Sequence, residues 1–151
     1  MVDAKSWGND LPNSIVTARA YFKAAHPGNF FRLFSPINQV LALLCLVLFW
    51  KAFPAGRMLL GTALAMYVLC DVMTFAYFYP RNSILFTSAN PHDTATLLKA
   101  WKEWSNMNWI RSLALLVGIF CSFLFIHKRF YTAENKTAII SASTRQTVAA
   151  Q

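Results

Sequence analysis

The sequence predicts an all-helical integral membrane protein, a prediction that rests on three observations. Hydrophobic residues make up 56% of the 151-residue chain, and only 13% of its residues are charged. Soluble domains usually contain about 25% charged residues. The apolar residues are gathered in three long runs, which polar segments separate. Because a polypeptide in lipid has to satisfy its own backbone hydrogen bonds, each run is expected to be a helix.

The three runs place the predicted membrane spans at about residues 37–53, 58–79 and 109–127. A hydrocarbon core of about 30 Å requires about 20 helical residues, a length that the second run reaches without extension. The first span is expected to begin at Pro36, a favourable first helical residue, and to end at the turn before Arg57. The second span is expected to end at Pro80.

Two shorter helices are expected at the membrane surface, over residues 14–25 and 94–107. In the second helix, Leu97, Leu98, Trp101 and Trp104 recur at intervals of three and four residues, which is typical of an amphipathic helix. Asp93 or Thr94 can cap its start, and the helix can run straight into the third span as one long rod. The chain is thus expected to form a single bundle domain over 1–130, followed by a loosely ordered polar tail over 131–151.

Charge and cysteine content limit the possible partners. The chain contains 14 Lys and Arg against six Asp and Glu, and the basic residues flank the apolar runs instead of forming one stripe. This distribution favours contact with the lipid bilayer and its anionic headgroups over nucleic-acid binding. The three cysteines lie inside apolar runs, and no Cys or His has a partner at metal-ligand spacing. Neither a disulfide framework nor a metal site is therefore predicted.

The orientation in the membrane follows from the basic residues nearest the span ends, which are Lys51, Arg57, Lys128 and Arg129. They favour a cytoplasmic position for the 54–57 loop and the C-terminal tail of a protein of the bacterial inner membrane. Residues 1–35 then lie outside, although they contain no apolar stretch that could carry them across. Either the orientation is reversed, or a preceding helix is missing and the three spans belong to a four-helix bundle.

Asp71 is the clearest candidate for a functional residue, because it lies near the middle of the second run. A charge at that depth costs at least about 2.5–3.5 kcal/mol. Tyr67, Thr74 and Phe78 share its helical face, which is expected to point into the bundle, with Tyr67 and Thr74 as ligand contacts. The carboxylate either handles a proton, anchors a ligand, or serves as a structural partner that locks the helices together.

Arg111 is the expected ion-pair partner of Asp71, because helical geometry separates the two by about 7 Å along the membrane normal. Alternatively, its guanidinium extends to the headgroups. Four ligand-binding candidates are expected at the same membrane face, namely Arg81, Asn82, Trp104 and Asn108. They would form the polar mouth of a pocket between the second and third spans, suited to a flat apolar ligand. The alternative is ordinary interfacial anchoring by tryptophan.

Two pairs of small residues allow helices to approach closely, Gly61 with Ala65 and Gly118 with Ser122. They serve packing within the chain, or association in a homo- or hetero-oligomer.

Several short motifs carry a resemblance to a known family: Asp10-Leu-Pro12, Ser35-Pro36, Asp71-x-x-Thr74-Phe75, Phe78-Tyr79-Pro80-Arg81-Asn82 and Trp101-x-x-Trp104-x-x-x-Asn108-x-x-Arg111. Over roughly residues 7–130, this order resembles the small multi-pass membrane family that includes the anthrone oxygenase-like proteins. The resemblance implies a four-helix membrane protein whose first span precedes a segment like residues 7–35. It also implies, for some relatives, oxidation of anthrones to anthraquinones without a metal or flavin, so no cofactor is expected.

Three functions remain open. The first is a membrane binding module or small enzyme acting on an apolar aromatic or quinone-like compound, with Asp71 as base or anchor and Arg111 and Asn108 polarising an oxygen. The second is a structural or assembly subunit of a larger membrane complex, without a catalytic role. The third, a transporter or ion path, is disfavoured because so few ionisable groups lie inside the spans.

Overall fold

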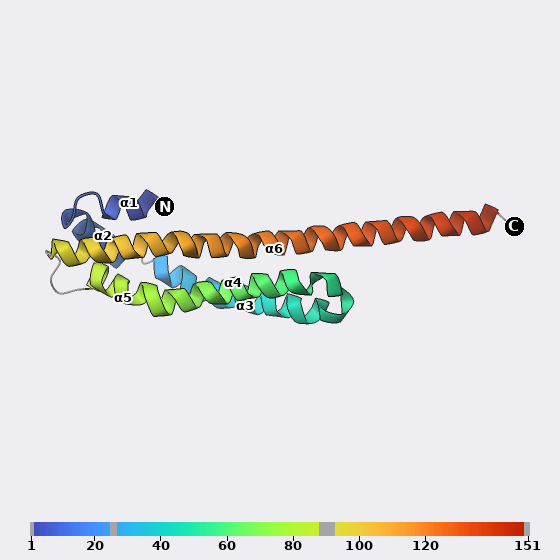
Figure 1. The fold of residues 1–151 in the computed structure, drawn as a ribbon, viewed down its shortest axis with the longest axis horizontal. Coiled ribbons are helices and arrows are strands. Elements are labelled where there is room, and N and C mark those ends of the chain that lie inside the picture. Colours follow the sequence, from blue (N-terminus) through green and yellow to red (C-terminus); the bar gives the residue numbers. More distant parts are fainter. Residues whose placement is uncertain (1, 25–26, 88–92, 150–151) are drawn as a thin grey trace.

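The computed structural model describes residues 2–24, 27–87 and 93–149, which form an elongated helical bundle. No strand occurs in these ranges, and the long helix α6 runs past all the other helices (Figure 1). Three segments are long and apolar enough to cross a membrane, namely Gly28–Ala52, Pro54–Thr87 and Thr94–Glu134. The predicted fold class, an all-helical membrane bundle with three spans, is therefore confirmed.

The first span is helix α3 (Pro27–Ala52), which begins well before the predicted start at residue 37. Pro27 has the role expected of Pro36, because the missing N–H of a proline costs little in the first helical turn. Pro36 instead lies inside the helix. Spanning helices tolerate an internal proline because neighbouring groups satisfy the carbonyl that it leaves unpaired.

The helical backbone of the second span continues past Pro80, where the sequence predicts that the helix ends. A short 3-10 helix, η1 (Pro54–Gly56), leads into α4 (Arg57–Met73), and the span continues through the π-helical η2 (Thr74–Phe78). It then passes through α5 (Tyr79–Asn82) to a second π-helical segment, η3 (Ser83–Thr87). In an α-helix the proline ring clashes with the carbonyl four residues earlier. The widened turn of η2 lies directly before Pro80, which gives the helix a way to continue past it.

The third span is part of α6 (Thr94–Ala149), into which the predicted amphipathic helix over 94–107 runs without a break. The backbone remains helical to Ala149, whereas the sequence predicts a loosely ordered tail from residue 131. Asp93 caps the first turn, accepting a hydrogen bond from the Thr96 N–H at 3.1 Å. The hydrogen bonds of Thr96 hold the pKa of Asp93 below its usual value. The cap is therefore fully effective above the ordinary carboxyl pKa of about 3.9 and is lost as the pH falls through the lowered one.

Helix α4 is the central helix, packing against α3 on one side and α6 on the other. Tyr67 of α4 faces α6, where its hydroxyl lies 3.2 Å from the Ser122 hydroxyl. A Cβ at Gly118 would lie 2.8 Å from Cε1 of Tyr67, so a glycine is needed at this crossing. The second small-residue pair is not used in this way, because nothing lies within 4 Å of a Cβ placed at Gly61.

The end of the bundle opposite η1 is covered by a cap, formed by α1 (Val2–Trp7) and α2 (Asn13–Ala24). Helix α2 matches the predicted helix over 14–25, of which residue 25 lies outside the described residues. Ile15 of α2 is fully buried with Leu85 of η3 and Leu97 of α6. Arg19 of α2 donates to the carbonyls of Ile84 and Leu85 at 3.2 and 2.7 Å. These carbonyls lie in the last turn of the second span, where no later backbone N–H of the same helix is available to donate to them.

Gly118 of α6 and Gly61 of α4 provide a matched test of the packing between these two helices. We expect Gly118→Leu to destabilise the protein by about 1–3 kcal/mol, because the new side chain overlaps the Tyr67 ring. Gly61→Leu is the control, since its side chain would enter open space. Thermal unfolding in detergent should show a lowered midpoint for Gly118→Leu alone, and equal midpoints for the two variants would contradict this packing.

Candidate functional site

Asp71 lies near the end of α4 and faces α3. One carboxylate oxygen accepts a hydrogen bond from the Ser35 hydroxyl at 2.6 Å, and the other accepts one from the Gln39 amide at 2.5 Å. The two donors are four residues apart, so one face of α3 supplies both. A carboxylate has about four acceptor positions, so further positions remain for a ligand. Sequence reasoning did not single out Ser35 or Gln39 as partners, although two polar residues at this spacing beside an apolar run are a usable signal.

Arg111 does not form the predicted ion pair with Asp71. In the ranges that the structure describes, the one ion pair joins Arg81 to Glu103. The reason is the direction in which α4 presents neighbouring residues, since Asp71 faces α3 while Cys70 faces α6. The Cys70 thiol donates to the Arg111 carbonyl at 3.7 Å, which places the two helices in contact at this level. The predicted ion pair assumed that Asp71 faces α6, whereas its two hydrogen-bond donors come from α3.

The Arg111 guanidinium is held by a neutral amide and an aromatic ring. One of its terminal nitrogens donates to the Asn108 side-chain oxygen at 2.7 Å, and its central carbon lies 4.2 Å from the centre of the Phe78 ring. A guanidinium has five N–H donors, and Asn108 is the only acceptor found for them among the described residues. No fully buried side-chain nitrogen or oxygen in that part of the chain lacks a partner. The remaining donors of Arg111 are therefore accessible to a ligand.

The π-helical segment η2 determines which side chain lies beneath Arg111. In a regular α-helix, Phe78 would share the face of Asp71, as the sequence predicts. A π turn closes its hydrogen bonds over five residues, which rotates the side chains that follow it. Phe78 consequently faces α6, where it is 1% exposed and lies 5.5 Å from the Trp104 ring. The face that the sequence predicts for Asp71 and Phe78 is therefore divided between two sides of the second span. The Thr74 hydroxyl donates a hydrogen bond to the Cys70 carbonyl, one turn earlier in the same span, at 2.8 Å.

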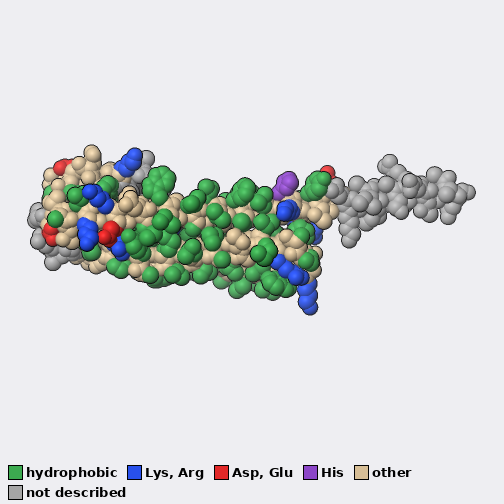
Figure 2. Space-filling model, viewed as in Figure 1, with side chains coloured by type: hydrophobic (Ala, Val, Ile, Leu, Met, Phe, Trp, Pro, Cys, Tyr) green, Lys and Arg blue, Asp and Glu red, His purple; other side chains and the backbone are tan. Residues whose placement is uncertain are grey.

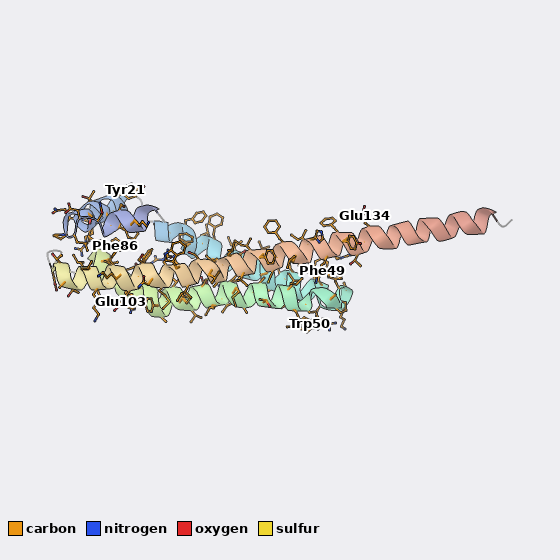
Figure 3. The ribbon with its side chains drawn as sticks, turned by 45° about the horizontal axis from the view of Figure 1, so that its top comes forward. Tyr21, Phe49, Trp50, Phe86, Glu103 and Glu134 are labelled. Atoms are coloured by element: carbon orange, nitrogen blue, oxygen red, sulfur yellow. The ribbon has the colours of Figure 1, made fainter. Side chains whose placement is uncertain are left out.

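The residues predicted to form a polar mouth do lie near one end of the bundle, but most of them are paired between helices. Arg81 binds Glu103 at 2.8 Å, and its guanidinium carbon lies 3.4 Å from the centre of the Tyr77 ring. Trp104 donates its indole N–H to the Asn82 side-chain oxygen at 2.9 Å. Figure 3 shows Glu103 on α6 where that helix passes this end of the second span. These contacts join the second span to α6, and sequence reasoning missed Glu103 and Tyr77.

A shallow hollow of about 390 Å³ lies on another part of the molecule, on the outer face of α6. Its lining residues all come from this one helix: Phe123, Ile126, His127, Phe130, Tyr131 and Glu134. At 1.5 Å per residue, it begins about 18 Å along the helix from Arg111. It is therefore not the pocket predicted between the second and third spans.

No group of three His, Cys, Asp or Glu that could hold a metal occurs in the part of the chain that the structure describes. His26 and His92 lie outside that part.

Comparison with known families identifies the chain. The family model for anthrone oxygenase matches residues 29–121. The chain belongs to the anthrone oxygenase family. The match begins near the start of α3 and ends within α6, so it includes Asp71, Arg111 and the interhelical pairs around them. No curated protein and no solved structure matches the chain.

The pairing of Asp71 with α3 can be tested by a double-mutant cycle. We expect Gln39→Leu to cost about 1–3 kcal/mol, because it leaves a partly buried carboxylate short of a donor. Adding Asp71→Leu should recover most of this loss, since both polar partners are then replaced by apolar groups. The measurement is unfolding in detergent, and Asn38→Leu, at an exposed neighbouring position, is the control. Strictly additive losses would show that the two side chains do not interact.

Proposed function

We propose that this protein binds a flat aromatic ketone or quinone-like compound within the membrane and oxidises an anthrone with dioxygen. The observation on which this proposal rests is the Arg111 guanidinium. It lies in a membrane-spanning helix, half-buried over the Phe78 ring, with a neutral amide as its hydrogen-bond acceptor. A preorganised cation without a carboxylate partner, in a site of low dielectric constant, can stabilise negative charge that develops on a ligand oxygen.

A cation of this kind can favour the chemistry of the reaction, because negative charge develops on a ligand oxygen. Removing a proton from the methylene carbon of an anthrone gives an enolate, whose charge resides largely on the ring carbonyl oxygen. Dioxygen then takes electrons from the methylene carbon and, with a proton, forms a hydroperoxide there. Loss of water from the hydroperoxide leaves the second carbonyl of the anthraquinone, so dioxygen consumed and water released are equal in amount.

In this proposal Asp71 accepts the methylene proton and Arg111 holds the enolate oxygen. The Ser35 hydroxyl and the Gln39 amide each donate to one carboxylate oxygen, and together they fix the orientation of the Asp71 side chain. Asn108 positions the guanidinium through its side-chain oxygen. Trp104 offers an aromatic face. Tyr67 and Thr74, one helical turn before and after Asp71, are proposed as further ligand contacts, for which each hydroxyl would exchange its present bond to Ser122 or to the Cys70 carbonyl.

The inner membrane of a bacterium is the proposed location, with the 54–57 loop and the C-terminal tail on the cytoplasmic side. Support for this orientation comes from Lys51, Arg57, Lys128 and Arg129, which flank the ends of the spans on that side.

A structural subunit of a larger membrane complex is a second candidate function. It is favoured by the pairing of Arg81 with Glu103 and of Asn82 with Trp104, because these polar residues are already used to join helices. In that case Asp71 and Arg111 also serve only packing.

The proposal is tested by oxidation of anthrone by the purified protein in lipid nanodiscs, followed by the absorbance of anthraquinone and by dioxygen uptake. We expect Arg111→Gln to lower kcat/KM by about 10²–10³-fold, the usual effect of losing an oxyanion donor. Asp71→Asn should lower kcat by about 10²–10⁴-fold, as expected when a general base is removed. Arg32→Gln, an exposed position on α3, is the control and should retain activity.

Protein-free nanodiscs give the background rate. A wild-type rate equal to that background would refute the enzymatic proposal. The structural alternative would then be supported by stable co-purification with another membrane protein, together with loss of that complex in the Asp71→Asn variant.

A further inference from the structure

Basic side chains surround the turn between the first two spans. Phe125 of α6 is buried against Phe49, near the end of α3, and against Phe53, which follows that helix. Gly56 of η1 packs on the same Phe125 ring. The residues three and four positions after Phe125 lie one turn further on the same side of α6. Four basic residues therefore gather around η1: Lys51, Arg57, Lys128 and Arg129. Figure 2 shows Lys and Arg side chains collected at this end of the apolar surface.

Arg57 is fixed in place in a way that leaves part of its guanidinium available. Its Nε donates to the Trp50 carbonyl at 2.5 Å, and its guanidinium carbon lies 5.1 Å from the centre of the Trp50 ring. No acceptor is found for its two terminal nitrogens among the described residues, and neither nitrogen is fully buried. A guanidinium held through Nε presents these nitrogens as a fork, a geometry that matches two oxygens of one phosphate.

No carboxylate neutralises this cluster in the described part of the chain, where the one ion pair lies at the opposite end of the bundle. Glu134 follows on the outer face of α6, in the wall of the hollow, and therefore on the side away from Phe125. The cluster thus has a net positive charge at the point where the apolar helices leave the hydrocarbon region.

We propose that Arg57, with Lys51, Lys128 and Arg129, forms a binding site for the headgroup of an anionic phospholipid. The position favours a lipid over a soluble anion, because Trp50 is 49% exposed at the level where tryptophan side chains meet headgroups. The adjacent outer face of α3 is strongly apolar, with Val47 and Leu48 64% and 70% exposed, and it provides a surface for the acyl chains. The phosphate binds the Arg57 fork, and the other three side chains add attraction at longer range.

The experiment measures lipid binding to the full chain in detergent by native mass spectrometry, comparing phosphatidylglycerol with phosphatidylcholine of the same acyl chains. We expect wild-type protein to retain phosphatidylglycerol preferentially, and Arg57→Gln to weaken that retention at least about tenfold. Lys128→Gln/Arg129→Gln should weaken it less, and it leaves the contact of Arg57 with Trp50 intact. Lys99→Gln, exposed near the other end of α6, is the control and should bind as wild type.

Equal retention of the two lipids, or wild-type retention by Arg57→Gln, would overturn the proposal. Displacement of the lipid by millimolar glycerol phosphate would also overturn it, because the site would then recognise a small soluble anion. Thermal unfolding of each variant without added lipid separates loss of binding from loss of folding. If Arg57→Gln fails to fold, Lys128→Gln/Arg129→Gln decides the question, and unchanged retention in that variant refutes the site.

Discussion

A charge inside a bilayer has to be compensated by the protein itself, and this requirement organises the three spans. Asp71 is compensated from α3, through a hydroxyl and an amide. Arg111 is stabilised from its own helix and from the second span, through Asn108 and the face of Phe78. Since a charge within a membrane span is costly unless the protein compensates it, the helices that supply these partners are held in place. The second span therefore lies between α3 and α6, because its Asp71 takes donors from α3 and its Phe78 lies beneath Arg111 of α6.

Opposite charges at the same depth would normally be expected to pair, so their separation in this bundle is informative. An ion pair neutralises both members and leaves neither available to a ligand. Here each charge is stabilised by neutral groups, which lower its burial cost without removing the charge. The arrangement keeps an acceptor, the Asp71 carboxylate, facing α3 and a donor, the Arg111 guanidinium, over the Phe78 ring. Such a separation is of use to a site that moves a proton from a ligand and stabilises the resulting anion.

The composition and the length of the apolar runs were sufficient to predict the three membrane-spanning helices. They were not sufficient to predict which neighbouring helix each side chain faces, because that depends on how each helix is rotated about its axis. Apolar runs gave the three spans, and the spacing of Leu97, Trp101 and Trp104 gave the continuous start of α6. The helix start expected at Pro36 and the helix end expected at Pro80 were wrong. Helix α3 begins at Pro27, and the backbone stays helical through Pro80, where the widened turn of η2 relieves the clash of the proline ring. The Asp71–Arg111 pair was wrong because the rise per residue gives only the position of a side chain along its helix, whereas the side to which Asp71 points depends on how α4 is rotated against α3 and α6.

Trp104 links the family region to the cap, which lies outside it. The Trp7 ring of α1 lies 5.4 Å from the Trp104 ring, and Trp104 in turn lies 5.5 Å from Phe78 beneath Arg111. A cation over an aromatic face is positioned only as well as the ring that supports it. The Trp104 ring cannot turn without breaking its bond to Asn82, so contacts from the cap and from α5 restrain the same side chain. The position of the Arg111 guanidinium therefore depends on contacts that begin at Trp7, in a helix far from it in sequence.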